Sequence, residues 1–529
     1  VASPTWQGYA LVALLAALAY ANSLQGDFVH DDLLAIVGNP DAQPGAPLSR
    51  LMGHDFWGKS MRSPTSHKSY RPFCVLTFRL NVWLGGMHPW GFHVLNVCLH
   101  AATCVAFAGF GRSVLWPPAE RSLPGAPWLA AALFAVHPVH TEAVSGIVGR
   151  ADVLACLLFL ASFCAYVRCS RRRHCCPVTE SPGLLALSLL LGGAAMLVKE
   201  TGVTALGAAL AYDALVLSRL PPCRIVFKKS LKDTPLEEGN GQWRRGGLCS
   251  GMVLLPLIKW SVMGAKLPAF MEQDNPASFS PHRLTRFLTY SYLCALNAWL
   301  LLCPRTLSYD WQAGSVELLT SARDPRVLAP TGLALGLGII AMRCARTPQE
   351  RRVLTAGLLL LVLPFLPASN LFFRVGFVMA ERILYLPSMG SCLLVTHALT
   401  SLYLRAGARA RPPVAAAALC LLALFAAKTL QRNQVWRSRE ALFRHGCRSG
   451  VETLPHNAKA HYNYANLLRD KGETERARQH YRAALSLCPG HASALNNLGT
   501  LAHELGHAES LYRRALAAAP THAGAMFNL

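Results

Sequence analysis

Apolar and polar stretches alternate along the chain on the length scale of membrane-spanning helices. A helix needs roughly 20 residues to cross a hydrocarbon core of about 30 Å. Blocks such as "GYALVALLAALAYANSL" and "VLTAGLLLLVLPFLPASN" approach that length and are separated by short polar segments. The pattern predicts an all-α, polytopic membrane bundle with eleven spans, at residues 7–24, 92–113, 128–148, 152–168, 183–198, 201–219, 247–265, 326–342, 353–370, 385–403 and 413–428.

One further block, "RFLTYSYLCALNAWLLLCP" (286–304), does not fit this scheme as a full span. Counting it would move the basic segment "RCARTPQERR" to the side opposite the other basic segments. Its Tyr290, Tyr292 and Trp299 are typical of the aromatic belt at a membrane interface. We therefore expect an interfacial or re-entrant helix, and a genuine twelfth span with another block misassigned is the alternative.

Composition agrees with a membrane protein: 52% of the 529 residues are hydrophobic and 15% are charged, against about 25% charged in soluble domains. The formal net charge of +23 is collected in short segments between apolar blocks, which is typical of cytoplasmic loops. Nucleic acid is therefore not expected as a partner. Residues 25–90, 266–325, 371–384 and everything after 429 then fall on the opposite side of the membrane.

The sequence predicts neither a disulfide framework nor a cleaved signal peptide. The 17 cysteines show no disulfide framework and no zinc-ligand spacing. The first apolar block lacks the basic flank and the small-residue cleavage site of a signal peptide, so we expect a retained helix.

After residue 429 the sequence becomes amphipathic and repeats. In residues 458–489 the offsets of a tetratricopeptide repeat are occupied by Tyr464, Ala465, Gly472, Ala477, Tyr481, Ala484 and Pro489. Small residues at these offsets let two antiparallel helices approach closely. Residues 430–529 are therefore predicted to be a repeat domain that follows a membrane domain at 1–429.

A second copy at 492–520 is three residues shorter between Gly506 and Tyr512. Three residues are about one helical turn, so we expect its second helix to be misaligned and the copy to be distorted. The chain stops at "AGAMFNL", which begins a third copy, and further repeats are expected in the complete protein.

Two adjacent carboxylates, Asp31 and Asp32 in "GDFVHDD" (26–32), stand where the first apolar block ends. They are typical either of a solvated loop start or of working acids beside a lipid-embedded substrate. The loop that follows favours the second interpretation. It carries Lys68 and Arg71 among aromatic residues, and such side chains either reach toward headgroups or hold the phosphate of a lipid.

"HPVHTEAVSGIVGRAD" (137–152) interrupts an apolar run with His137, His140, Glu142, Arg150 and Asp152. Ionisable groups at the end of a span are costly unless they are paired or wetted. The spacing of the histidines and Glu142 is not a zinc signature, so no metal is predicted here. A polar turn in which Arg150 pairs with Asp152 is the plainer interpretation.

More charged residues fall on the same predicted side of the membrane. Lys199 and Glu200 form the turn "KETG", and Arg374, Glu381 and Arg382 lie in "FFRVGFVMAERILYLPS". Acids and bases from separate segments thus converge on one face. The chain has no glycine-rich phosphate loop, no nucleophile elbow and no soluble nucleotide-binding unit, and a donor carried by a lipid needs none of these.

"GDFVHDDLLAIVGNPD", "SHKSYRPFCVLTFRLN", "HPVHTEAVSGIVGRADVLA", "KETGVTAL" and "ERILYLPSMG", followed by tetratricopeptide repeats, together resemble the transmembrane and tetratricopeptide repeat-containing O-mannosyltransferases. The resemblance implies a multispan fold of the lipid-dependent (GT-C type) glycosyltransferase class in the endoplasmic reticulum membrane. Mannose would pass from dolichyl-phosphate-mannose to Ser or Thr of cadherin and protocadherin extracellular domains. The repeats would lie in the lumen.

The resemblance also implies roles for residues. Asp31 or Asp32 matches the acid of the first lumenal loop at the reaction centre, and would accept the hydroxyl proton. Arg374 and Arg382, and with less support Lys68 and Arg71, would hold the lipid phosphate. Residues expected to shape the site are Glu142, Arg150, His137, Lys199 and Glu200. No tightly bound cofactor is expected, and a divalent metal at the two carboxylates is an alternative that we do not expect.

Two other functions fit parts of the sequence. A non-catalytic membrane scaffold would bind a protein partner through the repeat groove, but the paired carboxylates argue against it. A transporter would carry ionisable residues at mid-span, whereas here they cluster mostly at span ends. Lys259, inside "LLPLIKWSVMG", is the main exception.

Overall fold

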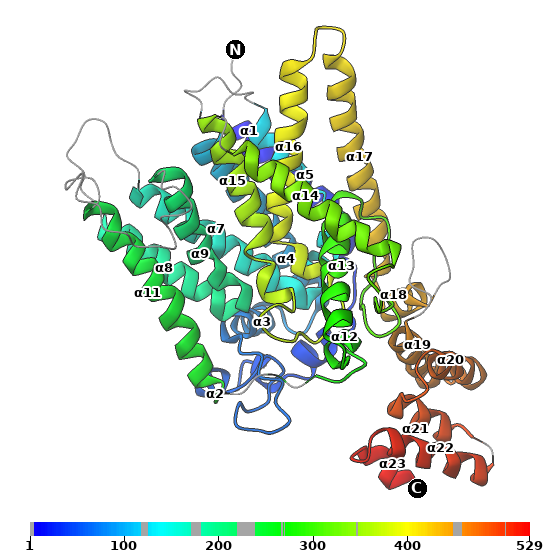
Figure 1. Ribbon diagram of the computed structural model, residues 1–529. Coiled ribbons are helices and arrows are strands. Elements are labelled where there is room, and N and C mark those ends of the chain that lie inside the picture. The colour runs from blue at the N-terminus through cyan, green and yellow to red at the C-terminus, as the bar shows by residue number, and fades with distance from the viewer. Residues whose placement is uncertain are drawn as a thin grey trace. The chain divides into compact units, whose positions relative to one another are not determined.

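The computed structural model describes residues 5–117, 125–170, 181–218, 239–265, 268, 270–344, 347–447, 457–502 and 504–529. The chain divides into two compact units (Figure 1). The first, which we call the bundle unit, consists of residues 1–269, 332–372 and 382–434. The second, the repeat unit, consists of residues 270–331, 373–381 and 435–529. The division predicted from the sequence, at residue 429, does not place 270–331 and 373–381 with the repeats.

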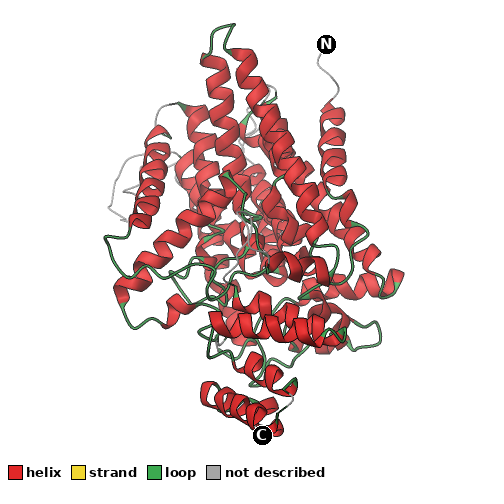
Figure 2. Ribbon diagram, turned by 90° about the vertical axis from the view of Figure 1, so that its right-hand side faces the viewer, coloured by secondary structure: helices red, strands yellow, loops and turns green. Residues whose placement is uncertain are grey.

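The bundle unit consists of helices joined by loops, and Figure 2 shows no strand in the described part of the chain. Several helices start at proline, whose fixed φ suits the first turn. The helices are α1 (Thr5–Ala19), α2 (Leu48–Gly53), α3 (Pro72–Gly85), α4 (Pro89–Phe110), α5 (Ala126–Ala135), α6 (Thr141–Val144), α7 (Arg150–Ser170), α8 (Pro182–Val198), α9 (Thr204–Tyr212), α11 (Gly239–Val262), α15 (Pro348–Val362) and α16 (Pro387–Arg405). Two more, α14 (Leu328–Arg343) and α17 (Arg411–Val435), cross the division between the units.

Among the described residues, six helical stretches are long and apolar enough to cross a membrane: Pro89–Leu115, Ile147–Ser170, Glu200–Leu217, Pro325–Arg343, Pro348–Ala368 and Arg411–Val435. Two shorter apolar helices, Ala126–Ala135 and Pro182–Val198, accompany them. The chain is therefore a multi-pass membrane protein, as its apolar pattern predicted. The eleven-span count stays a prediction. Two of the basic segments between apolar blocks, "RIVFKKSLK" (224–232) and most of "RCSRRRHCCP" (168–177), lie outside the described residues.

The predicted span 128–148 is not one helix. Its first part forms α5, which ends at Ala135, and short helical turns at Pro138–His140, Thr141–Val144 and Ile147–Gly149 follow. Pro138 has no backbone N–H to donate, which removes a hydrogen bond of the α-helical ladder and favours a break here. The break turns the chain within the unit and leaves Glu142 between two apolar helices.

Close helix packing in the bundle unit depends on glycine at particular contacts. Gly390 of α16 faces α15, and a Cβ at this position would collide with the backbone oxygen of Gly357 and the backbone nitrogen of Leu361. Gly202, in the turn before α9, lies equally close to the backbone of Ala195. Figure 1 shows α15 beside α16.

The repeat unit contains the α-helices α12 (Pro276–Phe279), α13 (Arg283–Leu302), α18 (Arg439–Gly446), α19 (Ala458–Asp470), α20 (Thr474–Leu487), α21 (Ala492–Thr500), α22 (Leu505–Ala518) and α23 (Ala523–Asn528). Several begin at side-chain caps: Ser438, Asn457 and His491 each accept a backbone N–H of the first turn. The block predicted to be interfacial is α13. It is one continuous helix and is not among the six stretches apolar enough to span.

The shortened second repeat is not distorted where we predicted. Its second helix, α22, has 14 residues, as many as α20 in the first repeat. Tyr512 and Ala515 are buried in it, and Tyr512 packs directly on Gly499 of α21. The missing residues come from the first helix instead, because α21 has 9 residues against 13 in α19. Packing of the small residues fixes the register of the two helices, so the shortening falls in α21.

Candidate active site

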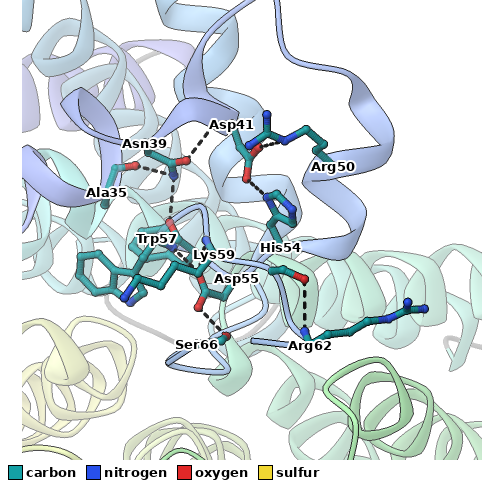
Figure 3. Close-up of polar contacts among 12 residues, drawn as sticks. Ala35, Asn39, Asp41, Arg50, His54, Asp55, Trp57, Lys59, Arg62 and Ser66 are labelled. Atoms are coloured by element: carbon teal, nitrogen blue, oxygen red, sulfur yellow. Dashed lines mark hydrogen bonds and ion pairs between the residues drawn. The ribbon is translucent and has the colours of Figure 1, made fainter. Parts of the chain in front are cut away.

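The segment between α1 and α4, which follows the acidic pair, is organised by buried polar side chains (Figure 3). Asn39 donates to the carbonyls of Ala35 (3.0 Å) and Phe56 (3.1 Å) and accepts from the Asp41 N–H. Asp55 accepts four hydrogen bonds, from three backbone N–H groups and from the Ser66 hydroxyl. A long loop with its polar groups satisfied in this way holds a defined shape.

Asp31 and Asp32 have different surroundings. Asp32 is buried, with one carboxylate oxygen 3.0 Å from the Val29 nitrogen and the other 2.9 Å from the Val148 nitrogen. Burial raises the pKa of Asp32 to about 7 against the lowering effect of these backbone donors. The Asp31 side chain keeps 24% of its surface exposed and contacts the Arg382 guanidinium at 3.1 Å. Of the pair, Asp31 is therefore the carboxylate that a substrate can reach.

Arg382 joins the acidic pair to Glu142. Its guanidinium lies 3.1 Å from Asp31 and 3.3 Å from Glu142, and its backbone N–H donates to the other Glu142 oxygen at 2.8 Å. Glu142 is buried, and burial raises its pKa to about 7 although Arg382 acts in the opposite direction. The two acids hold the pKa of Arg382 above its ordinary value despite the cost of burial, so this guanidinium stays charged.

A second charged group surrounds Glu200. Arg71 donates to it through Nε (3.1 Å) and Nη2 (2.9 Å), and the Lys259 ammonium lies 3.0 Å from its other oxygen. Two cations thus share one carboxylate, which leaves a formal surplus of one positive charge. Burial disfavours the charge of Arg71, but Glu200 raises its pKa, and the opposing effect of Arg382 places the two guanidinium groups within electrostatic range.

Lys199 forms a buried ion pair with Asp152, and both side chains are 8% exposed. The predicted pair of Arg150 with Asp152 is wrong. Arg150 is fully buried and donates to neutral acceptors: Asn96 Oδ1 (2.7 Å), Asn81 Oδ1 (2.6 Å) and the Phe92 carbonyl (3.0 Å). A guanidinium has five donors in a rigid fork, and here they join α7 to α3 and α4.

The other predicted site residues lie elsewhere. His137 is buried, accepts a hydrogen bond from the Val139 N–H and packs against Phe425. The Lys68 ammonium is buried and donates to the backbone carbonyls of Met61 and Ser63, which holds its own loop. Arg374 belongs to the repeat unit, where its guanidinium lies over the ring of Phe279. The bundle unit therefore brings together Asp31, Arg382 and Glu142, and near them Arg71, Glu200, Lys199 and Asp152.

Sequence reasoning missed two contributors to this arrangement. Lys259 is not an isolated charge in an apolar helix but a partner of Glu200, 59 residues away. Asn96 supports Arg150 with its oxygen and donates to backbone carbonyls from Val144 to Ile147. A lone lysine in an apolar block was a signal for the first, because such a charge needs a partner. An asparagine within α4 gave no such signal.

Two segments of the chain match known families. Residues 264–338 match the family described as "Protein O-mannosyl-transferase TMTC, DUF1736". Residues 465–506 match the family described as "TPR repeat", which confirms the predicted tetratricopeptide repeats.

Similar curated proteins cover nearly all of this chain. Protein O-mannosyl-transferase TMTC1 of Mus musculus is 45% identical and that of Homo sapiens 46% identical, each over 94% of the chain. Protein O-mannosyl-transferase TMTC4 of Homo sapiens is 45% identical over 91% of the chain. The chain spans 60% and 57% of the two TMTC1 proteins and 66% of TMTC4. Among solved structures, ArnT from Cupriavidus metallidurans bound to undecaprenyl phosphate gives a TM-score of 0.41 at 12% identity, over all of this chain and 88% of that one.

Proposed function

Because the chain belongs to the TMTC family of protein O-mannosyl-transferases, we propose that it forms the catalytic part of an O-mannosyltransferase of the endoplasmic reticulum membrane. The donor is dolichyl-phosphate-mannose, and the acceptors are Ser or Thr hydroxyls of cadherin-type extracellular domains. The repeats lie in the lumen. The relatives' printed names supply the reaction, and the pairing of Asp31 with Arg382 is the observation in this chain that carries the proposal.

Asp31 is the base in this mechanism. An acceptor hydroxyl attacks C1 of the mannose while a carboxylate takes its proton, and the bond between C1 and the phosphate oxygen breaks with inversion at C1. The base has to come within about 2.6–3.2 Å of the hydroxyl, which favours the partly exposed Asp31 over the buried Asp32. Asp32 instead has a structural role, because it accepts hydrogen bonds from the backbone N–H groups of Val29 and Val148 and so holds these two segments together.

The departing dolichyl phosphate leaves with the electron pair of the broken bond and needs positive charge nearby. Arg382 already faces two carboxylates. The surplus positive charge lies at Arg71, whose side chain is 22% exposed while that of Lys259 is 7% exposed. We therefore assign phosphate binding to Arg71 first, with Arg382 orienting Asp31. Arg150 and Lys68, held by neutral acceptors, support the fold of the site.

Transfer of labelled mannose from dolichyl-phosphate-mannose to a cadherin extracellular domain tests this assignment, in membranes that contain the complete protein. Asp31→Asn should lower the rate about 10²- to 10⁴-fold, the usual contribution of a general base. Asp27→Asn is the matched control, since Asp27 is an exposed acid of the same loop start. It should transfer normally.

Two results would contradict the proposal. Normal transfer by Asp31→Asn removes the carboxylate mechanism while leaving the reaction. No transfer by the complete wild-type protein, with cadherin or with any Ser/Thr acceptor, removes the reaction itself and leaves a membrane scaffold with a repeat groove.

Arg71→Gln should raise KM for the lipid donor more than for the acceptor, because its charge faces the phosphate.

A further inference from the structure

Three side chains with metal-binding atoms meet in the repeat unit. Cys447 follows α18, His461 lies in α19 and His480 lies in α20. One ligand atom of each, a sulfur and two ring nitrogens, lies within 4.8 Å of the other two, and all three residues are half-buried. Across the described part of the chain, no other three or more His, Cys, Asp or Glu residues meet at this spacing. They share no residue with the site around Asp31.

The repeat architecture fixes two of the three. His461 and His480 are 19 positions apart and come from the two antiparallel helices of the first repeat. Their Nδ1 atoms face each other at 3.0 Å, and the ring centroids are 5.2 Å apart with the planes inclined by 28°. In a tetrahedral zinc site, zinc to nitrogen and zinc to sulfur distances of about 2.0–2.3 Å place the donors roughly 3.3–3.6 Å from one another. The ligand atoms lie within 4.8 Å of one another, so movements of about 1 Å bring them to these values.

We propose that Cys447, His461 and His480 bind a zinc ion, with a water molecule completing its fourth position. One thiolate and two imidazoles are a donor set that zinc prefers over the oxygen-seeking cations. Binding would release the thiol proton of Cys447 to solvent and would use both histidines in their neutral form. No sequence signature announces the site, since its ligands come from three elements and do not stand at the short spacing of a zinc motif.

The site would fasten the end of α18 to the first repeat. The chain leaves α18 at Gly446, and α19 begins at Ala458. A metal held by one residue after α18 and one residue from each helix of the hairpin constrains these three elements together. Metal binding stabilises a fold by its binding free energy when the unfolded chain binds the ion more weakly. Zinc should therefore raise the unfolding temperature of the repeat unit.

A hydrogen-bonded histidine pair beside an uninvolved thiol is the competing explanation, and metal content distinguishes the two. The full chain is purified in detergent with an affinity tag that contains no histidine, loaded with zinc and dialysed against zinc-free buffer. We expect about one zinc ion per chain at this site, and its loss in Cys447→Ser and in His480→Gln. Cys488→Ser and His507→Gln are the controls in the same unit and should keep the metal.

Binding of Co²⁺ gives a second test, because its thiolate absorption appears only if Cys447 ligates the metal directly. The wild type loaded with Co²⁺ should show a thiolate-to-cobalt charge-transfer absorption, and Cys447→Ser should lose it while its helical circular dichroism is unchanged. The proposal is overturned if the dialysed wild type holds no more zinc than Cys447→Ser. It is equally overturned if the two control variants lose as much zinc as the ligand variants, or if the cobalt band survives in Cys447→Ser.

Discussion

Charges are used in opposite ways in the two units. In the bundle unit the ion pairs join distant segments: 351 positions separate Asp31 from Arg382, and 129 separate Arg71 from Glu200. Their side chains are buried or mostly buried. In the repeat unit several ion pairs join neighbours on one helix, such as Arg513 with Glu509 at i,i+4, where both partners are exposed.

The two kinds of ion pair differ in the desolvation free energy that they cost the folded protein. Taking an ion pair out of water carries a desolvation penalty that its mutual attraction often fails to repay. A chain selected for stability alone gains little from holding Asp31 and Arg382, both mostly buried, against the buried Glu142. Exposed helix pairs carry no such cost and contribute little. This contrast supports the proposal that the bundle charges serve chemistry, while the exposed repeat charges suit solubility.

Substitution of Arg150 should reduce stability most. This buried charge of the bundle unit has neutral partners, so it serves the fold and differs from the ion pairs around it. Arg150→Met keeps the side-chain length but leaves the oxygens of Asn96 and Asn81 and the Phe92 carbonyl without their donor. We expect the free energy of unfolding to fall by about 3–5 kcal/mol, because each buried acceptor left unsatisfied costs about 1–3 kcal/mol. The midpoint of thermal unfolding in detergent measures it.

The control for Arg150 is Arg513→Met, which removes an exposed arginine of the repeats. It should leave the midpoint nearly unchanged. Equal midpoints for the two variants would show that the Arg150 contacts contribute no more than a solvated charge.

The stability of each unit should depend on pH through one carboxylate, Glu142 in the bundle unit and Glu440 in the repeat unit. The pKa of Glu142 is raised to about 7 by burial, so its contribution to stability is complete below about pH 4.5 and is lost as pH rises through about 7. The pKa of Glu440 is lowered, first by its hydrogen bond from Lys471, so its contribution is present above about pH 4.5 and is lost on acidification. The two units therefore respond with opposite sign.

Variants isolate each contribution from the rest of the titration. Relative to the wild type, Glu142→Gln should gain thermal stability between about pH 5 and about pH 8. Glu440→Gln should be less stable than the wild type at about pH 6, and that deficit should disappear near pH 3.5. A Glu142→Gln difference that does not change with pH would show that Glu142 is as solvated as an ordinary glutamate.

Local sequence patterns predicted the helices but not the tertiary contacts between them. The apolar blocks predicted most of the membrane helices, and the repeat offsets predicted α19 and α20, because both signals lie within one helix or one hairpin. The predicted span 128–148 ran across the break at Pro138, although His137, His140 and Glu142 interrupt the apolar run there. Most residues around Asp31 were named as a group, but the predicted pair of Arg150 with Asp152 was wrong, because Arg150 and Lys199 could each reach Asp152 by sequence alone. Only the packed helices decide that Lys199 does.

The smallest expected effect tests the repeat side of the comparison. In Glu509→Gln the ion pair with Arg513, 2.5 Å apart and with both side chains largely exposed, is lost while the helix keeps its length and its buried residues. Exposed i,i+4 pairs contribute about 0.3–0.5 kcal/mol at low salt, so the unfolding midpoint should shift by a degree or less and the shift should vanish at high salt. A loss as large as that of Arg150→Met, persisting in salt, would mean that the repeat charges are structural as well. The contrast between the units would then rest on burial alone and no longer argue that the bundle charges serve chemistry.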